Sequence, residues 1–395
     1  MVRRRSEVVV VSNDLTPGFG LPVAAPGLRA FGLAHGLRSH GFDVRTVVPR
    51  TIVDRQWPGA VPAAPPADTD VIDMNRLSEY LATRAPVTAI VINSNQSDQL
   101  VKHEGVRIVV DFFAPKMLEL AYESVGQYPV DRLAALRARK LRAIELADAF
   151  IVNGGKKVPY FLSWLLQTSQ DVRTVQMPVV NMCVPITRTV ARDDGELRLL
   201  VAGYAQTWNS VGRAVPVLRA KLEEHPKLRL DIVWRRHWGG TGAATSTAGG
   251  EFADLEEHPS VRVHDIMTFS AFRELLGRMD VAVDLFGRTL EREYAMVTRS
   301  AVALASGLPI VHPPFTEVSQ FVRRFGAGWL VDADDLNGFA ALINQLVGDP
   351  AILAEATAGA ERAAAEVFDP SVAVRPLVRL LDALDEVDAP GVPAA

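Results

Sequence analysis

The sequence alternates short apolar runs rich in β-branched residues with longer stretches of helical periodicity along most of its 395 residues. The first such run, Glu7–Ser12, is typical of a buried strand that is closed by a turn. A loop rich in Gly and Pro spans 13–20, Pro26-Gly27 opens a helix, and a second apolar run follows at 44–48. Strand, glycine loop, helix and strand predict a doubly wound α/β domain with a parallel sheet.

The same alternation restarts after a polar stretch at 187–196, and a chain of this length exceeds what one hydrophobic core normally supports. We therefore expect two α/β halves of about 180 residues each. Further strands are expected at 88–92, 106–111, 149–152 and 173–177 in the first half, and at 197–201, 228–234, 261–264, 281–285, 309–312 and 329–331 in the second. Helices are expected around 76–84, 132–146 and 158–167.

Composition excludes several classes of protein. Lys plus Arg is 42 and Asp plus Glu is 46, a formal charge of −4, which disfavours a dedicated nucleic-acid binder. No apolar run approaches the roughly 18–20 residues that span a bilayer, so no integral membrane segment is expected. The single Cys183 forms no internal disulfide and indicates a reducing, cytoplasmic location. The eight His lack metal-ligand spacing, so neither a metal nor another cofactor is expected. The oligomeric state stays open.

The segment from Met296 to Glu317 predicts an anion site. A helix ends at Gly307, a strand starts near Pro309, and Thr316 can cap the next helix. The free N–H groups of that helix would then point into the crevice at the carboxyl edge of the sheet, where doubly wound folds bind their ligands.

The same segment resembles retaining GT-B glycosyltransferases of the glycogen-synthase-like superfamily (glycosyltransferase family four). The resemblance lies in Glu293, in Ala305-Ser-Gly-Leu-Pro-Ile-Val311 and in Phe315-Thr-Glu317, and it covers most of the chain in order and length. It implies two Rossmann-like domains that face each other across a cleft. Residues 1–187 would form the acceptor-side domain, residues 197–369 the nucleotide-sugar domain, and a helix at 370–386 would cross back onto the first domain.

The sequence also departs from the family pattern. Val302 stands where the family has its ribose-binding acid, and Glu293 matches the first acid only after a one-residue shift. The basic pair that usually clasps the diphosphate is missing from the loop after the first strand of the second half. That loop, Gly203 to Trp208, and Thr298-Arg299 look like a subset of the superfamily. Phosphate neutralisation is therefore assigned to Arg299, with Arg213 in reserve.

These matches imply a set of site residues. The donor-binding candidates are Gly203, Arg213, Thr298, Arg299, Phe315, Thr316 and Glu317. The catalytic candidates are Asp111, at the end of a predicted strand, and Glu293, which could hold sugar hydroxyls. The candidates on the acceptor-side loop are Asp14, Gly20 and Gly27. Several have a structural alternative: a helix cap for Asp111, a surface ion pair for Glu293 and a solvated helix position for Arg299. Thr316 and Glu317 could simply start a helix, and the loop residues could form plain turns.

The resemblance implies a hexosyltransferase that moves a sugar from a nucleotide sugar to a small-molecule or glycan acceptor, with retention and without metal. A catalytically degenerate nucleotide-sugar-binding or scaffold protein of the same fold is the main alternative, because the second acid is absent. An epimerase or a phosphorylase shares the fold but has no supporting signature here. A nicotinamide dehydrogenase is disfavoured because no G-x-G-x-x-G follows the first strand. The abundance of Ala and Arg suggests a bacterial source and a secondary-metabolite or cell-envelope product.

Overall fold

The computed structural model describes residues 5–55, 61–123, 126–185, 194–205, 210–236 and 250–387. The chain divides into two compact units, and each has a sheet and a hydrophobic core of its own. Within the described residues, the first domain comprises 5–117, 130–185 and 369–387, and the second comprises 118–129 and 186–368. The polar linker predicted at 187–196 lies largely outside the described residues.

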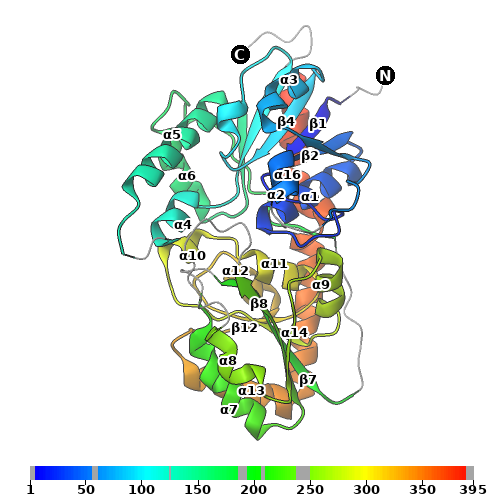
Figure 1. The fold of residues 1–395 in the computed structure, drawn as a ribbon, viewed down its shortest axis with the longest axis vertical. Coiled ribbons are helices and arrows are strands. Elements are labelled where there is room, and N and C mark those ends of the chain that lie inside the picture. The colour runs from blue at the N-terminus through cyan, green and yellow to red at the C-terminus, as the bar shows by residue number, and fades with distance from the viewer. Residues whose placement is uncertain are drawn as a thin grey trace. The chain divides into compact units, whose positions relative to one another are not determined.

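The first domain is a parallel six-stranded sheet flanked by helices (Figure 1). Its strands are β1 (Glu7–Val11), β2 (Val44–Pro49), β3 (Thr69–Ile72), β4 (Val87–Ile92), β5 (Val106–Phe112) and β6 (Ala149–Val152). Its helices are α1 (Ala25–Ser39), α2 (Arg50–Arg55), α3 (Leu77–Ala82), the start of α4 (Lys116–Glu123), α5 (Val130–Leu146), α6 (Lys157–Leu165), α15 (Pro370–Ala373) and α16 (Arg375–Val387). Short 3-10 turns occur at Met74–Arg76 and Ser97–Gln99.

The second domain repeats this plan. Its strands are β7 (Leu197–Ala205), β8 (Leu228–Arg236), β9 (Val261–Val263), β10 (Val281–Val283), β11 (Ile310–His312) and β12 (Gly328–Leu330). Its helices are α7 (Val215–Glu224), α8 (Ala253–Glu256), α9 (Phe269–Leu276), α10 (Leu290–Tyr294), α11 (Thr298–Ala305), α12 (Ser319–Phe325), α13 (Leu336–Gly348) and α14 (Pro350–Ala363). Two 3-10 turns, Gly212–Ala214 and Gly250–Phe252, and a π-helical turn, Ala364–Phe368, complete it.

Strand order fixes where a ligand can bind in each sheet. The first sheet runs β3-β2-β1-β4-β5-β6, and the second runs β12-β11-β10-β7-β8-β9, with parallel pairing throughout. Both are the Rossmann order, in which the first and fourth strands are neighbours and the order of strand addition reverses between them. The switch points are therefore β1/β4 and β7/β10. Crevices outside the carboxyl ends of these strands are the expected ligand sites.

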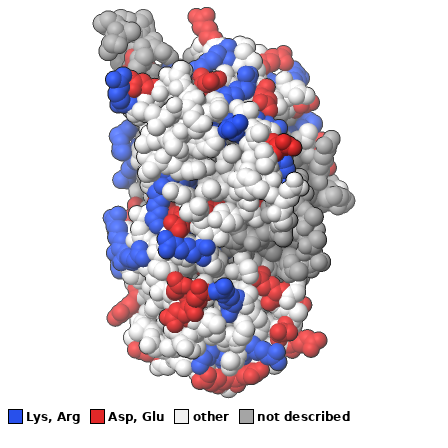
Figure 2. All heavy atoms as spheres, turned by 90° about the vertical axis from the view of Figure 1, so that its left-hand side faces the viewer, with Lys and Arg blue, Asp and Glu red and all other residues white. Residues whose placement is uncertain are grey.

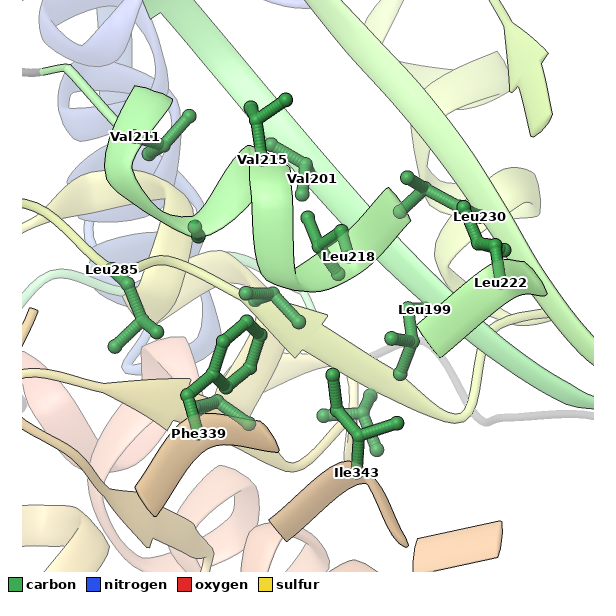
Figure 3. Packing of buried hydrophobic residues seen from close by; sticks show 14 of the residues in the cluster. Leu199, Val201, Val211, Val215, Leu218, Leu222, Leu230, Leu285, Phe339 and Ile343 are labelled. Carbon is green, nitrogen blue, oxygen red and sulfur yellow. The ribbon is translucent and has the colours of Figure 1, made fainter. Parts of the chain in front are cut away.

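The cores follow from the apolar runs. In the second domain, Leu199 and Val201 of β7 pack with Val215 and Leu218 of α7 and with Phe339 of α13 (Figure 3). The central strands of both sheets are buried along their length, because helices cover both faces. This burial explains why the central strands read as continuous apolar runs rather than as an alternating pattern.

Glycines allow α1 to approach its neighbours closely. A Cβ at Gly32 would lie 1.9 Å from the Cys183 carbonyl oxygen, and one at Gly36 would lie 2.4 Å from that of Pro370. The contact with Pro370 joins α1 to α15, so the end of the chain belongs to the first domain. In Figure 1, α16 accordingly lies with α1 although the two are far apart in sequence.

Two features differ from the sequence-based expectations. No strand forms at 173–177; this segment is irregular, and only an isolated bridge joins Val179 to Val152. The sixth place in the sheet is taken instead by β3 at the opposite edge. In addition, α4 begins in the first domain, whereas 118–129 groups with the second, where the Tyr122 hydroxyl accepts a hydrogen bond from the Leu290 N–H at 3.4 Å.

The surface carries charges of both signs, as the nearly equal numbers of basic and acidic residues predict. On the face shown in Figure 2, acidic side chains stand among the basic ones. Within the described residues, no helix combines the length and the apolar character that crossing a membrane requires.

Candidate functional site

The switch point of the second sheet carries a compact polar cluster. Gly203 lies near the end of β7, and Asp284 follows β10, its N–H donating to the Val311 carbonyl at 2.9 Å. Arg299 lies in the first turn of α11. The structure therefore brings together two of the predicted donor-binding residues, Gly203 and Arg299, with an acid that the sequence analysis did not select.

Asp284 fixes the position of the Arg299 guanidinium. Nε and Nη2 of Arg299 both lie 2.5 Å from Asp284 Oδ1, and the side chains are only 16% and 6% exposed. Burial opposes ionisation of Asp284, but Arg299 and the Ser300 hydroxyl outweigh it, and the pKa of the carboxyl lies below its ordinary value. The guanidinium carbon is 5.5 Å from the ring centres of both Trp234 and Phe286, so two aromatic rings also hold it.

Gly203 is required by this arrangement. Its φ of +151° is one that side-chain-bearing residues rarely adopt. A Cβ there would lie 2.9 Å from the Trp234 ring and 3.0 Å from Arg299 Nη1. The backbone at 203 therefore lies directly against the third nitrogen of the guanidinium. A ligand oxygen resting on this backbone would come within reach of that nitrogen.

A buried chain of side-chain hydrogen bonds extends from Asp284. The Ser300 hydroxyl donates to Asp284 Oδ2, so it accepts from His312 Nδ1 at 3.2 Å. His312 Nε2 then accepts from the Thr316 hydroxyl at 2.7 Å. His312 is fully buried, and burial lowers the pKa of its imidazole to about 4, against the attraction of Asp284. The imidazole is therefore neutral at physiological pH.

The loop after β11 leads into α12, which begins at Ser319 with Val318 at its N-cap and no side-chain cap. The helix cap predicted at Thr316 is therefore wrong, although Thr316 Oγ1 accepts a hydrogen bond from the Ser319 N–H at 3.3 Å. Phe315 meets Phe286 edge to face at 6.1 Å between ring centres. Glu317 is buried, and its Oε1 accepts from Gln320 Nε2 at 2.6 Å. These three donor-binding candidates are thus held by local packing.

Glu293 takes part in a surface ion pair. It lies in α10, which Thr289 caps, and its Oε1 accepts from Arg288 Nε at 2.6 Å. The Arg288 side chain is 68% exposed and that of Glu293 is 29% exposed, so the pair is weak. Thr298 starts α11 beside Arg299, with its hydroxyl 3.5 Å from the Met296 carbonyl.

Arg213 interacts with a residue outside the cluster of Gly203, Arg299 and Asp284. It is in the 3-10 turn before α7 and forms an ion pair with Asp334, where both side chains are about two thirds exposed. Trp208, which the resemblance included, lies outside the described residues.

In the first domain, Asp111 is engaged in a buried ion pair. Its carboxylate accepts from Arg29 Nε at 2.8 Å and from Nη2 at 3.2 Å, and neither side chain is exposed. Arg29 Nη1 also donates to the carbonyls of Val180 and Asn181, each at 2.8 Å. This pair ties α1 to β5 and to the segment after β6. A direct role of Asp111 in catalysis stays a prediction, and this geometry argues for a structural role.

The acceptor-side candidates lie in the loop after β1 and at the start of α1. Asp14 Oδ1 accepts from the Leu15 N–H at 2.7 Å, as in a tight turn. Gly20 is exposed with φ +68°. Gly27 is needed for packing, because a Cβ there would lie 1.6 Å from the Leu15 carbonyl oxygen.

Sequence reasoning missed Asp284, Ser300 and His312. Two of them had a usable signal: Asp284 is an acid inside an otherwise apolar predicted strand, and His312 ends another. Charged or polar groups in such runs are buried only with partners. Within the part of the chain that the structure describes, no group of three or more His, Cys, Asp and Glu could hold a metal ion.

The two Rossmann-type sheets define the GT-B fold, which confirms the fold class predicted from the sequence. Solved structures with this fold match the chain over nearly its whole length. Sucrose-phosphate synthase from Thermosynechococcus elongatus is 15% identical, with a TM-score of 0.65 over 97% of this chain and 100% of that one.

Two further structures are similar to the chain. HepE from Anabaena, solved in complex with UDP and glucose, is 11% identical, with a TM-score of 0.64 over 96% of this chain and 100% of that chain. WaaG, a glycosyltransferase involved in lipopolysaccharide biosynthesis, is 13% identical, with a TM-score of 0.61 over 95% of this chain and 99% of that one. No family model matches the sequence, and a search of curated proteins finds no match. At such identities the likeness shows the fold alone.

Proposed function

We propose that this chain is a glycosyltransferase that moves a sugar from a nucleoside diphosphate sugar to a hydroxyl of a small-molecule or glycan acceptor. The observation that carries the proposal is the cluster of Gly203, Arg299 and Asp284 at the switch point of the second sheet. A fixed guanidinium beside a backbone without a side chain suits a diphosphate. The GT-B fold and similar structures that hold UDP support the same assignment.

In the proposed reaction, the acceptor oxygen forms a bond to the anomeric carbon while the bond from that carbon to the diphosphate oxygen breaks. The bonding electrons leave with the diphosphate, and the acceptor proton passes to a departing phosphate oxygen. Charge therefore builds up on the leaving group. Arg299, held in place by Asp284, would stabilise this charge with little reorganisation, since its position is fixed before the reaction starts. We propose transfer with retention and without a metal ion.

Other predicted site residues would bind the donor beside Arg299. Glu293 would hold sugar hydroxyls after releasing Arg288, since their pair is exposed and costs little to break. Thr316 and Glu317 would contribute N–H groups of the loop after β11 toward the phosphates. A nucleotide-sugar substrate and a single, buried Cys183 support a cytoplasmic location.

A second candidate function is nucleotide-sugar binding without catalysis. The burial of Asp111 in its pair with Arg29 favours it, because a candidate catalytic acid is then occupied. Both functions require diphosphate binding, but only the first releases free nucleoside diphosphate from the donor.

The test uses calorimetric titration with UDP, GDP and TDP, and donor turnover. Arg299→Ala alone would leave Asp284 buried and unpaired, so the informative variant is Arg299→Gln with Asp284→Asn, which removes both charges and keeps hydrogen bonding. We expect the variant to bind the preferred diphosphate at least tenfold more weakly than the wild type. Arg219→Gln, in an exposed pair on α7, is the control that keeps wild-type affinity. Equal affinity of all three proteins would contradict the proposal, and binding without turnover would favour the second function.

A further inference from the structure

The second domain has an open pocket at the outer edge of its sheet. Residues of α12, β12 and α13, all labelled in Figure 1, line this pocket, and its volume of about 440 Å3 is within the range of small-molecule sites. β12 lies two strands beyond β10, so the pocket is separate from the cluster at the switch point. The lining includes Val322, Arg323, Trp329, Leu330, Val331 and Leu342.

The position of β12 at the edge of the sheet explains why the lining is largely apolar. Side chains alternate along a strand, so Trp329 and Val331 pack toward the core cluster that contains Leu342, whereas Leu330 faces the other side. All three β12-side residues are partly exposed, because no described strand pairs with the outer side of β12. An aromatic and aliphatic wall is therefore accessible from solvent.

The polar side-chain groups of this pocket can only donate hydrogen bonds. Arg323 carries a guanidinium, and Trp329 carries an indole N–H. Among the described residues, the Arg323 side chain has one partner, the Pro314 carbonyl, to which its Nη2 donates at 2.6 Å, and it forms no ion pair. No acid is among the described residues that line the pocket. A positive charge beside an apolar wall is complementary to an anion.

These two features together indicate the chemistry of the ligand. An inorganic anion would leave the apolar wall in contact with water, and a neutral compound would leave the guanidinium without a counter-charge. A small molecule with an aromatic or branched aliphatic body and one carboxylate satisfies both. Its body can pack on Trp329, and its carboxylate can accept two N–H groups of Arg323.

Arg323 also connects the pocket to the loop after β11. The Pro314 carbonyl accepts from Arg323 and, at 3.0 Å, from the Ser319 hydroxyl. Pro314 directly precedes three donor-binding candidates, which occupy 315–317. Each terminal nitrogen of a guanidinium carries two N–H groups, so Arg323 can hold a carboxylate and Pro314 at the same time.

A ligand in the pocket would strengthen the contact with the loop. The Arg323 side chain is exposed, and a long exposed side chain loses rotamer freedom when one contact holds it. A bound carboxylate fixes the guanidinium beforehand, so the bond to Pro314 then forms with a smaller loss of freedom. Two ligands that benefit from the same ordering bind cooperatively, and the effect is reciprocal.

We propose that the pocket of α12, β12 and α13 binds a small carboxylate with an aromatic or branched aliphatic body, and that this ligand strengthens donor binding through Arg323. The binding site is inferred from the pocket alone, whereas the effect on the donor rests on the proposed function. Arg323 is a positioning residue, because it holds the loop and not the donor.

The first experiment detects binding by NMR of the full chain labelled with 15N-tryptophan. The indole signal of Trp329 is assigned by its loss in Trp329→Phe. Naphthalene-1-acetate, 3-phenylpropanoate and 4-methylpentanoate are each titrated beside the corresponding amide. We expect at least one carboxylate to shift the Trp329 signal and to bind about tenfold more tightly than its amide. An unmoved signal with all three, or equal affinity of every acid and its amide, overturns the inference.

Neighbouring arginines provide a variant and a matched control. Arg323→Gln should reduce carboxylate affinity about tenfold and leave amide affinity unchanged. Arg324→Gln removes an exposed charge that pairs with Glu366 at 3.6 Å and lies outside the pocket lining, so it should keep the wild-type affinities. Equal losses in both variants would show a general effect of charge and overturn the inference. The comparison of acid with amide in the wild type needs no variant to fold.

The second experiment measures the effect on the donor site. The diphosphate that binds best is titrated by calorimetry with and without a saturating concentration of the carboxylate. We expect the carboxylate to lower the Kd of the diphosphate at least threefold in the wild type and to leave it unchanged in Arg323→Gln. An unchanged or higher Kd in the wild type overturns the effect on the donor. Absence of diphosphate binding overturns the proposed function, and the NMR titration then still decides whether the pocket binds carboxylates.

Discussion

Burial of His312 makes the stability of the second domain depend on pH. Burial lowers the pKa of this imidazole from 6.5 to about 4, against the attraction of Asp284, and its neutral form is held between Ser300 and Thr316. In the unfolded chain the imidazole takes up a proton as pH falls through 6.5, whereas in the folded chain it does so only near pH 4. The stabilisation is therefore complete above pH 6.5 and declines as the pH falls below it.

The magnitude follows from the size of the pKa shift. Each pH unit within this window costs about 1.4 kcal/mol, so the free energy of unfolding should fall by about 3 kcal/mol between pH 6.5 and pH 4 because of His312 alone. His312→Gln carries no group that titrates there. The variant should be less stable at neutral pH, but it should lack this part of the pH dependence.

Hydrogen exchange detected by mass spectrometry measures this effect in the full chain. Peptides that cover β10 and β11 report the opening free energy of the second domain without contributions from the first. The series runs from pH 4 to pH 7.5 in wild type, His312→Gln and His103→Gln, an exposed control. Equal pH slopes in wild type and His312→Gln below pH 6.5, or a wild type more stable at pH 4.5 than at pH 7, would refute the reasoning.

Three other substitutions test features of the two domains. Gly203→Ala should displace Arg299 and weaken nucleoside diphosphate binding about tenfold or more by calorimetry; an unchanged affinity would show that the close approach is unimportant. Arg29→Met should destabilise the first domain by about 3–5 kcal/mol in urea unfolding, whereas adding Asp111→Leu should recover much of the loss, because a paired hydrophobic replacement leaves no buried charge. If the double variant is as unstable as the single one, the ion pair is not the cause. Gly32→Ala should lower the unfolding midpoint by forcing α1 away from the Cys183 carbonyl, and a midpoint equal to that of the wild type would contradict that contact.

The apolar runs were sufficient to predict most of the two sheets. The strands expected at 106–111 and 149–152 form as β5 and β6 within one residue of their predicted ends. The exceptions are informative. β3 (Thr69–Ile72) is a half-buried edge strand whose Asp70 pairs with Arg45, so it lacks the apolar signal of a central strand. The segment 173–177 also mixes polar and apolar residues, but it forms no strand in the sheet that the structure describes.

The candidate site was less predictable, since it depends on partners that meet only in the folded chain. Arg299 was selected from a local motif, but Asp284, which fixes its guanidinium, lies fifteen residues earlier on a different element. The amides of Asn93 and Asn153 gave no signal in the sequence, where each is a single polar residue after a strand. Their oxygens accept hydrogen bonds from the Ala114 N–H and from the Lys157 ammonium, and these contacts exist only in the folded chain.

The place of α15 and α16 affects how the chain matures during synthesis. Ser6, next to β1, donates to Asp385 of α16 at 2.9 Å, and Arg107 of β5 lies 2.6 Å from the same carboxylate. The first domain therefore lacks these partners until α16 has left the ribosome. The second domain is translated later, but it ends at Phe368, so it can complete its packing before α16 is available to the first.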